Sequence, residues 1–169
     1  MRTRHLATCG AAALALACAG LPVSAPGGAS SGGSATPAPG NVSADVITYT
    51  NQQRARNGLP AFITSAQLMD AAAIQARQMA SSQRLDHVQA GAQYPTVESR
   101  LQAVGYVYRD AAENIAWNQP DARAVLQSWM ASPGHRANIL DPQLTQIGAA
   151  MARSSKGEPY WVQVFGTPR

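Results

Sequence analysis

Apolar residues recur at three-to-four spacing in four segments of this chain, and each pattern predicts an amphipathic helix. Ser, Thr or Asp stands at each segment start, where it can cap the helix, and Gly or Pro follows most of the segment ends. The predicted helices cover residues 45–57, 65–82, 96–104 and 121–131.

After Pro142 the apolar pattern changes to that of two short strands. Residues 147–151 and 160–165 flank a Ser-Ser-Lys-Gly turn at 154–157, which predicts an antiparallel hairpin. Four helices followed by a hairpin favour an α+β fold in which helices cover a small sheet.

The first 44 residues differ from the rest in composition. A basic start with Arg2, Arg4 and His5 precedes an uncharged, mostly apolar stretch that ends at Leu21. This pattern is typical of a secretory leader, and we predict a signal peptide over residues 1–19. The protein is therefore expected to be secreted, periplasmic or held in the cell envelope.

Two ways of processing this leader stay open. The small residues on either side of Cys18 fit ordinary cleavage before Gly20, which would release the protein. Alternatively, residues 15–18 resemble an imperfect lipobox, and Cys18 would then become a lipidated N-terminus. Contact with a membrane is expected only through such a lipid anchor.

Residues 20–44 predict a linker, since 20 of the 23 residues between Pro22 and Ala44 are Gly, Ser, Pro, Ala or Thr. Such a segment cannot bury enough apolar area to offset its ordering entropy. The folded domain is therefore predicted over residues 45–169.

Composition narrows the chemistry of this domain. The two cysteines of the chain are Cys9 and Cys18, so the domain has no disulfide, thiolate metal site or cysteine nucleophile. From Asp45 onward, 11 basic and 9 acidic side chains leave a net charge of about +2. Nucleic-acid binding needs a concentrated basic face, so no nucleic-acid partner is expected.

Three residues carry candidate chemistry: His87, Glu113 and His135. The two histidines are predicted in loops, and Glu113 leads into an apolar stretch with a tryptophan, where a carboxylate needs a partner. Simpler interpretations stay open, namely surface histidines and a carboxylate that ties down a loop. Ser132 precedes His135 by three residues, but the Pro-Gly between them favours a helix-ending serine over a nucleophile.

Several motifs occur together and in a recognisable order. They are NQQRARNGLP at 51–60, AENIA at 112–116, WMASPGHRANIL at 129–140, QIG at 146–148 and YWVQVFG at 160–166. The first resembles the opening helix and loop of the CAP superfamily (the SCP/PR-1-like domain of cysteine-rich secretory, antigen-5 and pathogenesis-related-1 proteins). The next two are similar to its Gly-Glu-Asn motif and to the bacterial form of its Gly-His motif, and the last two fit its closing strands. The resemblance covers about residues 45–168.

This resemblance implies a three-layer α-β-α sandwich with a small antiparallel sheet and a cleft. In that family two histidines and two glutamates face the cleft, and some members bind a divalent cation there. His87, Glu113 and His135 match three of these positions, while Ser132 stands where the second glutamate would be. The positions expected to be structural are Asn114, Trp129 and Asn138.

A partial set of this kind allows two arrangements. His87, Glu113 and His135 could hold Zn²⁺ with one position open to water, while Ser132 hydrogen-bonds one of the ligands. Without a metal, Glu113 would accept a hydrogen bond from a histidine, and the same bonds could simply pin two loops to the sandwich.

Three functions follow from these features. The first is a binding or interaction module outside the cytoplasm, with a lipid or small hydrophobic ligand or with an envelope or host partner. The second is a metal-assisted hydrolase that uses His87, Glu113 and His135. The third is a structural envelope protein without a ligand.

Overall fold

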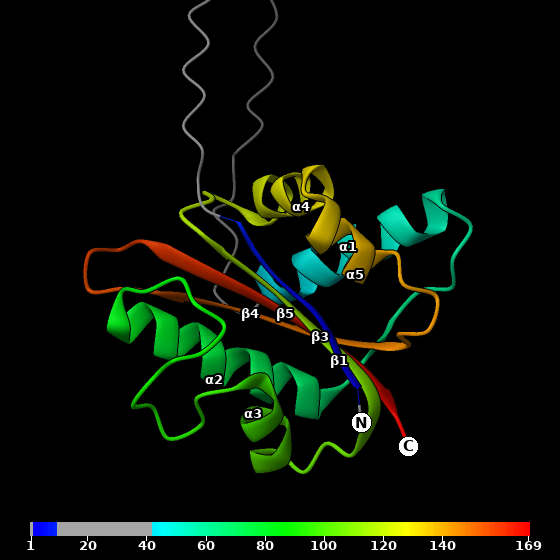
Figure 1. Ribbon diagram of the computed structural model, residues 1–169. Coiled ribbons are helices and arrows are strands. Elements are labelled where there is room, and N and C mark those ends of the chain that lie inside the picture. Colours follow the sequence, from blue (N-terminus) through cyan, green and yellow to red (C-terminus); the bar gives the residue numbers. More distant parts are fainter. Residues whose placement is uncertain (1, 10–41) are drawn as a thin grey trace, which may run out of the picture.

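One mixed sheet lies between two layers of helices in the computed structural model, which describes residues 2–9 and 42–169 (Figure 1). Three helices cover one face of the sheet: α1 (Val42–Arg56), α4 (Ala122–Ala131) and α5 (Pro133–Ile139). The opposite face carries α2 (Ala66–Ser82) and α3 (Val97–Ala103). This arrangement confirms the predicted α+β fold and its three α-β-α layers.

The sheet has five described strands in the spatial order β1-β3-β5-β4-β2. Their bounds are β1 Arg2–Cys9, β2 Ile63–Thr64, β3 Tyr108–Trp117, β4 Gln146–Arg153 and β5 Pro159–Pro168. The central pairs, β3 with β5 and β4 with β5, are antiparallel, whereas the edge strands β1 and β2 run parallel to their neighbours. The predicted hairpin is β4–β5, and both strands extend beyond their predicted ends.

The four predicted helices are confirmed as α1 to α4. Ser65, Thr96 and Asp121 each accept a hydrogen bond from a backbone N–H in the first turn of α2, α3 and α4. Each cap satisfies a donor that has no partner within the helix, and so fixes where the helix begins. Helix α1 begins at Val42 rather than at Asp45.

Among the elements that the sequence did not predict, two carry candidate residues. Glu113 lies in the middle of β3, which is buried on both faces and so lacks the alternation that marks a half-exposed strand. His135 lies in helix α5 rather than in a loop. Pro133 stands in the first turn of α5, where its missing N–H removes no hydrogen bond, so the Pro-Gly sequence begins a helix instead of a turn.

Most of the predicted leader, including Cys18, and nearly all of the predicted linker lie outside the described residues. Cleavage and lipidation therefore stay predictions. The described part of the leader is strand β1, which lies alongside β3 (Figure 1). Within the described ranges, every helix is too short or too polar to cross a membrane.

Apolar side chains fill the space on both sides of the sheet. Large core residues are Trp129, Trp161 and Phe165 on the α1–α4 side, and Leu68, Met79 and Leu101 on the α2–α3 side. Helix α2 lies so close to the sheet that a β-carbon at Gly148 would overlap the backbone of Leu68. Each large buried apolar side chain contributes about 1.5–3 kcal/mol, so the two cores together hold β3 and its polar side chains firmly between them.

Candidate functional site

Glu113 is the centre of a buried ion-pair arrangement. Its Oε1 lies 2.9 Å from His87 Nδ1, and its Oε2 accepts a hydrogen bond of 2.8 Å from Arg100 Nη2. Glu113 and Arg100 are 0% exposed, and His87 is 8% exposed. Both carboxylate oxygens are therefore engaged inside the protein, as a buried charge requires.

Arg100 is the member of this site that the sequence analysis missed. It lies on α3, whose apolar residues Val97 and Leu101 point into the core. Its guanidinium also donates to the backbone oxygens of Pro95 at 3.2 Å and of His87 at 3.4 Å. An arginine three residues after a core valine on a short helix is the signal that could have revealed it, because a buried cation needs an acidic partner.

His135 forms a separate contact with Ser132. His135 Nδ1 lies 2.7 Å from Ser132 Oγ, and the imidazole is 0% exposed. The serine ends α4 and precedes α5, but its hydroxyl contacts the histidine rather than capping a helix. The structure thus joins His87 with Glu113 and His135 with Ser132.

Two asparagines connect these pairs. Asn138 Nδ2 donates to Asn114 Oδ1 at 2.9 Å and reaches the backbone oxygen of Glu113 at 3.5 Å. Asn114 Nδ2 donates at 3.2 Å both to the backbone oxygen of His135 and to Gln163 Oε1. The β3 polar cluster, as we call this group, consists of His87, Arg100, Glu113, Asn114, Ser132, His135 and Asn138.

The remaining motif residues hold the elements that carry this cluster. Trp129 is fully buried, and its indole Nε1 donates to the backbone oxygen of Ile115 at 3.3 Å, which ties α4 to β3. Arg54 on α1 donates to the backbone oxygens of Ile139 and Asp141, both at 2.9 Å, and so holds the end of α5. Burial lowers the pKa of the Arg54 guanidinium, against the opposing effect of the Asp141 charge.

The β3 polar cluster does not fit the predicted zinc site. No group of three His, Cys, Asp or Glu side chains in the described part of the chain is arranged to hold a metal ion. Glu113 would have to leave Arg100 or His87 to become a ligand, and Arg100 would then be a buried cation without its carboxylate. The metal-assisted hydrolase therefore receives no support from this geometry.

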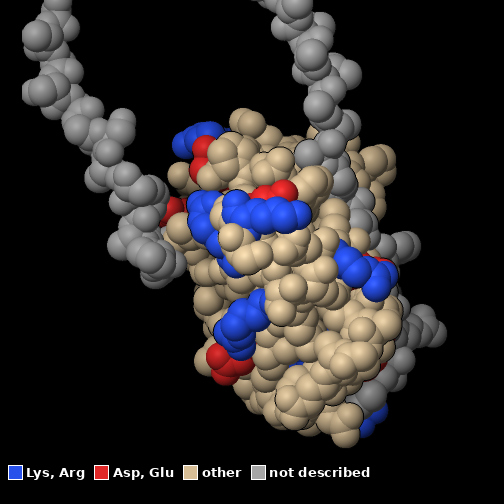
Figure 2. All heavy atoms as spheres, turned by 90° about the vertical axis from the view of Figure 1, so that its left-hand side faces the viewer, with Lys and Arg blue, Asp and Glu red and all other residues tan. Residues whose placement is uncertain are grey.

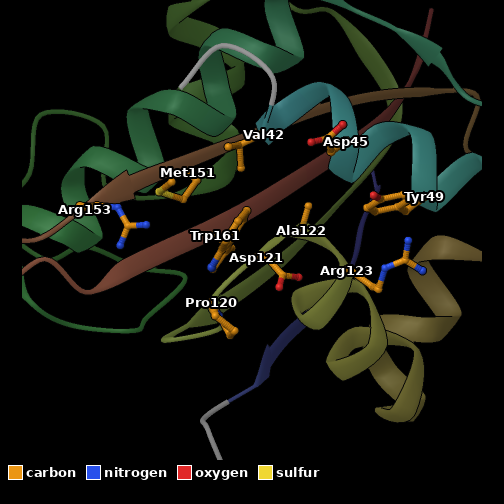
Figure 3. A pocket seen from close by; sticks show the side chains of 10 residues that line it. All are labelled: Val42, Asp45, Tyr49, Pro120, Asp121, Ala122, Arg123, Met151, Arg153 and Trp161. Atoms are coloured by element: carbon orange, nitrogen blue, oxygen red, sulfur yellow. The ribbon is translucent and has the colours of Figure 1, made fainter. Parts of the chain in front are cut away.

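The resemblance also implied a cleft that these residues face, whereas His87, Glu113 and His135 are buried and Ser132 is half-buried. An open pocket of about 370 Å³ lies elsewhere, between the start of α1, the start of α4, the end of β4 and the start of β5 (Figure 3). Tyr49, Met151 and Trp161 form its apolar walls, and its charged side chains are two arginines, Arg123 and Arg153, and two aspartates, Asp45 and Asp121. We call it the α1–α4 pocket.

A second hollow of about 370 Å³ continues between α1 and α4, and it shares Tyr49 and Arg123 with the first. The Arg123 guanidinium lies 5.0 Å from the centre of the Tyr49 ring, in the range of a cation–π contact. The sequence analysis did not find this pocket, because its residues come from distant segments and form no motif.

Comparisons with known proteins agree with this fold. The sequence model of CAP, described as the cysteine-rich secretory protein family, matches residues 47–165. YkwD from Bacillus subtilis strain 168, an uncharacterized protein, is 34% identical over 147 residues, which are 83% of this chain and 54% of YkwD. YlbC from the same strain, an uncharacterized membrane protein, is 27% identical over 71% of this chain and 33% of its own length. The chain thus spans about half of one relative and a third of the other.

Solved structures give the same result. An extracellular protein containing a SCP domain from Bacillus anthracis has a TM-score of 0.70 at 28% identity, over 76% of this chain and 41% of that one. An outer surface protein from Borrelia burgdorferi has a TM-score of 0.67 at 17% identity, over 73% of this chain and 90% of that one. At this identity the match shows only that the two proteins share a fold. The family match covers most of the folded domain and includes the motif residues placed above, so the chain belongs to the cysteine-rich secretory protein (CAP) family.

Proposed function

We propose that this protein works outside the cytoplasm as a binding module for a small amphipathic molecule, such as a lipid with one anionic group. One observation carries the proposal: the α1–α4 pocket is open and lined by aromatic, aliphatic and charged side chains, with a guanidinium at each end, whereas His87, Glu113 and His135 are buried. A pocket with apolar walls and a few polar groups is the usual form of a small-molecule site.

The arrangement of the pocket suggests how such a ligand would lie. Arg153 and Arg123 stand at opposite ends of the pocket, with Met151 and Trp161 between them (Figure 3). Apolar walls favour a hydrocarbon body by about 25 cal/mol for each Å² removed from water. A guanidinium at the end of the pocket would pair with a carboxylate or phosphate through two parallel hydrogen bonds.

The surface charge favours a small ligand over a large polyanion. On the face at the left of Figure 1, basic side chains form separate groups with acidic side chains beside them, and most of the surface between is uncharged (Figure 2). A large polyanion would need a continuous basic surface, and this face does not offer one.

The location outside the cytoplasm rests on three kinds of support. The sequence predicts a leader and a linker, the family is described as secretory, and the Bacillus anthracis structure is described as extracellular. A lipid anchor at Cys18 and free secretion are both compatible with this location.

The test uses the full chain and cis-parinaric acid, a fluorescent fatty acid with a carboxylate head and an apolar body. We expect saturable binding that weakens about tenfold in Arg123→Gln and in Tyr49→Leu, which remove the charge and the aromatic wall. Arg169→Gln is the matched control, because this exposed arginine does not line the pocket. Absence of saturable binding, or wild-type affinity in both pocket variants, would overturn the proposal.

A further inference from the structure

Strand β1 occupies the outer edge of β3. Four successive pairs run in parallel register from Leu6 beside Glu113 to Cys9 beside Ala116, and two more pairs follow beyond an irregularity between Thr3 and Leu6. The other edge of β3 is paired with β5 along most of its length. Strand β3 is therefore an interior strand only while residues 2–9 are in place.

The predicted processing removes this neighbour. Cleavage beside Cys18 would detach residues 2–9 and leave the outer backbone groups of β3 unpaired from Asp110 to Ala116. Backbone N–H and C=O groups in a protein are rarely left without partners, and an unpaired strand edge is a template for another extended chain.

The two ends of the sheet differ in how they are protected. At the far end, β2 has two residues, Ile63 and Thr64, and so short an edge offers little to an incoming strand. Strand β3 has ten residues and contains no proline, so it offers a much longer run of backbone groups than β2. Helix α5 packs beside β1, so a replacement strand would also contact this helix.

We propose that the outer edge of β3 is a strand-acceptor site. Before processing it is filled by the chain's own N-terminal segment, and afterwards by an extended segment of another polypeptide that adds in parallel. Main-chain hydrogen bonds would supply the affinity, as in other cases of strand addition to a sheet edge. The segment already seated there, with Leu6, Ala7 and Thr8 beside Glu113, Asn114 and Ile115, indicates a preference for small and apolar residues.

This proposal goes beyond the lipid-binding function and does not depend on it. The strand-acceptor edge involves β3 and α5, whereas the α1–α4 pocket is lined from α1, α4, β4 and β5. Binding of cis-parinaric acid can therefore succeed or fail independently of strand addition.

The test starts from the full chain with a protease recognition sequence placed in the Gly/Ser stretch at residues 27–34. In the intact protein, hydrogen exchange should be slow at alternate amides between Asp110 and Ala116. After cleavage and removal of the N-terminal fragment, these amides should exchange at least tenfold faster, while those of β5 and α4 keep their protection. A synthetic peptide with the sequence of residues 2–9 should restore the protection and bind saturably in fluorescence polarisation.

N-methylated peptides separate strand addition from side-chain binding. Alternate N–H groups of a strand point to opposite edges, so only one of two peptides should lose affinity, by about tenfold. One peptide carries N-methyl groups at Leu6 and Thr8, and its matched control carries them at Ala7 and Cys9. Equal affinities of the two would overturn the proposal.

Three other results would also overturn it. Fast exchange at β3 in the intact chain would mean that β1 does not protect the edge. Loss of protection in β5 and α4 after cleavage would make β1 part of the folding unit rather than the occupant of a site. Dimerisation of the cleaved protein with protection of β3 would assign the edge to a second copy of this chain.

Discussion

The β3 polar cluster and the α1–α4 pocket each have only some features of a functional site. The cluster holds the residues that the family motifs single out, but they are buried and bonded to one another. The pocket is open and has the lining of a ligand site, but it contains none of the three candidate residues His87, Glu113 and His135. Motif residues can therefore mark the internal frame of a fold, while the proposed binding site consists of side chains without a motif.

This comparison predicts opposite responses to mutation. Changes in the cluster should lower the free energy of unfolding, and changes in the pocket should leave it nearly unchanged. The predictions below run from the largest to the smallest expected effect on that free energy.

Glu113→Gln should destabilise the protein most, by about 3–5 kcal/mol, because it leaves Arg100 as a buried cation without a carboxylate. Urea unfolding followed by tryptophan fluorescence at pH 7 measures the change. A loss below about 1 kcal/mol would mean that Arg100 finds water or another partner.

A double variant serves as the control for this prediction. Glu113→Leu combined with Arg100→Met removes both charges and keeps apolar side chains of similar size. It should be more stable than Glu113→Gln alone, because a matched apolar pair has no unpaired buried charge. Equal instability of the two variants would shift the explanation from charge to packing.

Asn138→Ala should lower the free energy of unfolding by about 2 kcal/mol. It removes the donor to Asn114 Oδ1 and leaves that buried oxygen without this bond. Asn57→Ala is the matched control, because Asn57 is exposed and should change stability by at most about 0.5 kcal/mol. Similar losses in both variants would contradict a special role for the cluster.

The sequence predicted the helices and strands of the fold to different degrees. Helices α1 to α4 and the β4–β5 hairpin follow from regular apolar spacing, capping residues and a Gly-containing turn, which are all local signals. Strand β3 was missed because Glu113 and Asn114 interrupt its apolar pattern, and their partners come from α3 and α5. Local spacing cannot reveal a polar residue that is satisfied from another element.

The site itself was predicted in part. A hydrogen bond between Glu113 and a histidine is the arrangement expected without a metal, and the structure has one between Glu113 and His87. Arg100 and the burial of the cluster, in contrast, depend on how distant elements pack. The α1–α4 pocket brings together residues from Val42 to Trp161 and could be found only in three dimensions.

Tyr106, at the junction of α3 and β3, should add a smaller and pH-dependent effect. Burial raises the pKa of this phenol to about 12, and its hydroxyl donates to Gln146 Oε1 at 2.9 Å. An acid whose pKa is raised by folding contributes stability below its unfolded pKa of about 10, and this stability is lost as the pH rises towards 12. We expect a loss of about 1 kcal/mol between pH 9 and 11 that is absent in Tyr106→Phe. An identical pH dependence in both proteins would assign the loss to other groups.

Arg123→Gln should have the smallest effect on stability, within about 0.5 kcal/mol, because the side chain is exposed and its contact with the Tyr49 ring is in water. Its effect should emerge only with ligand. A ligand that binds the folded state raises its stability by RT ln(1 + [L]/Kd), so cis-parinaric acid at a hundred times Kd should add about 2.7 kcal/mol to the wild type. A tenfold weaker variant should gain about 1.4 kcal/mol at the same concentration. If Arg123→Gln instead unfolds as easily as Glu113→Gln without ligand, the pocket is part of the internal frame and the contrast between the two regions fails.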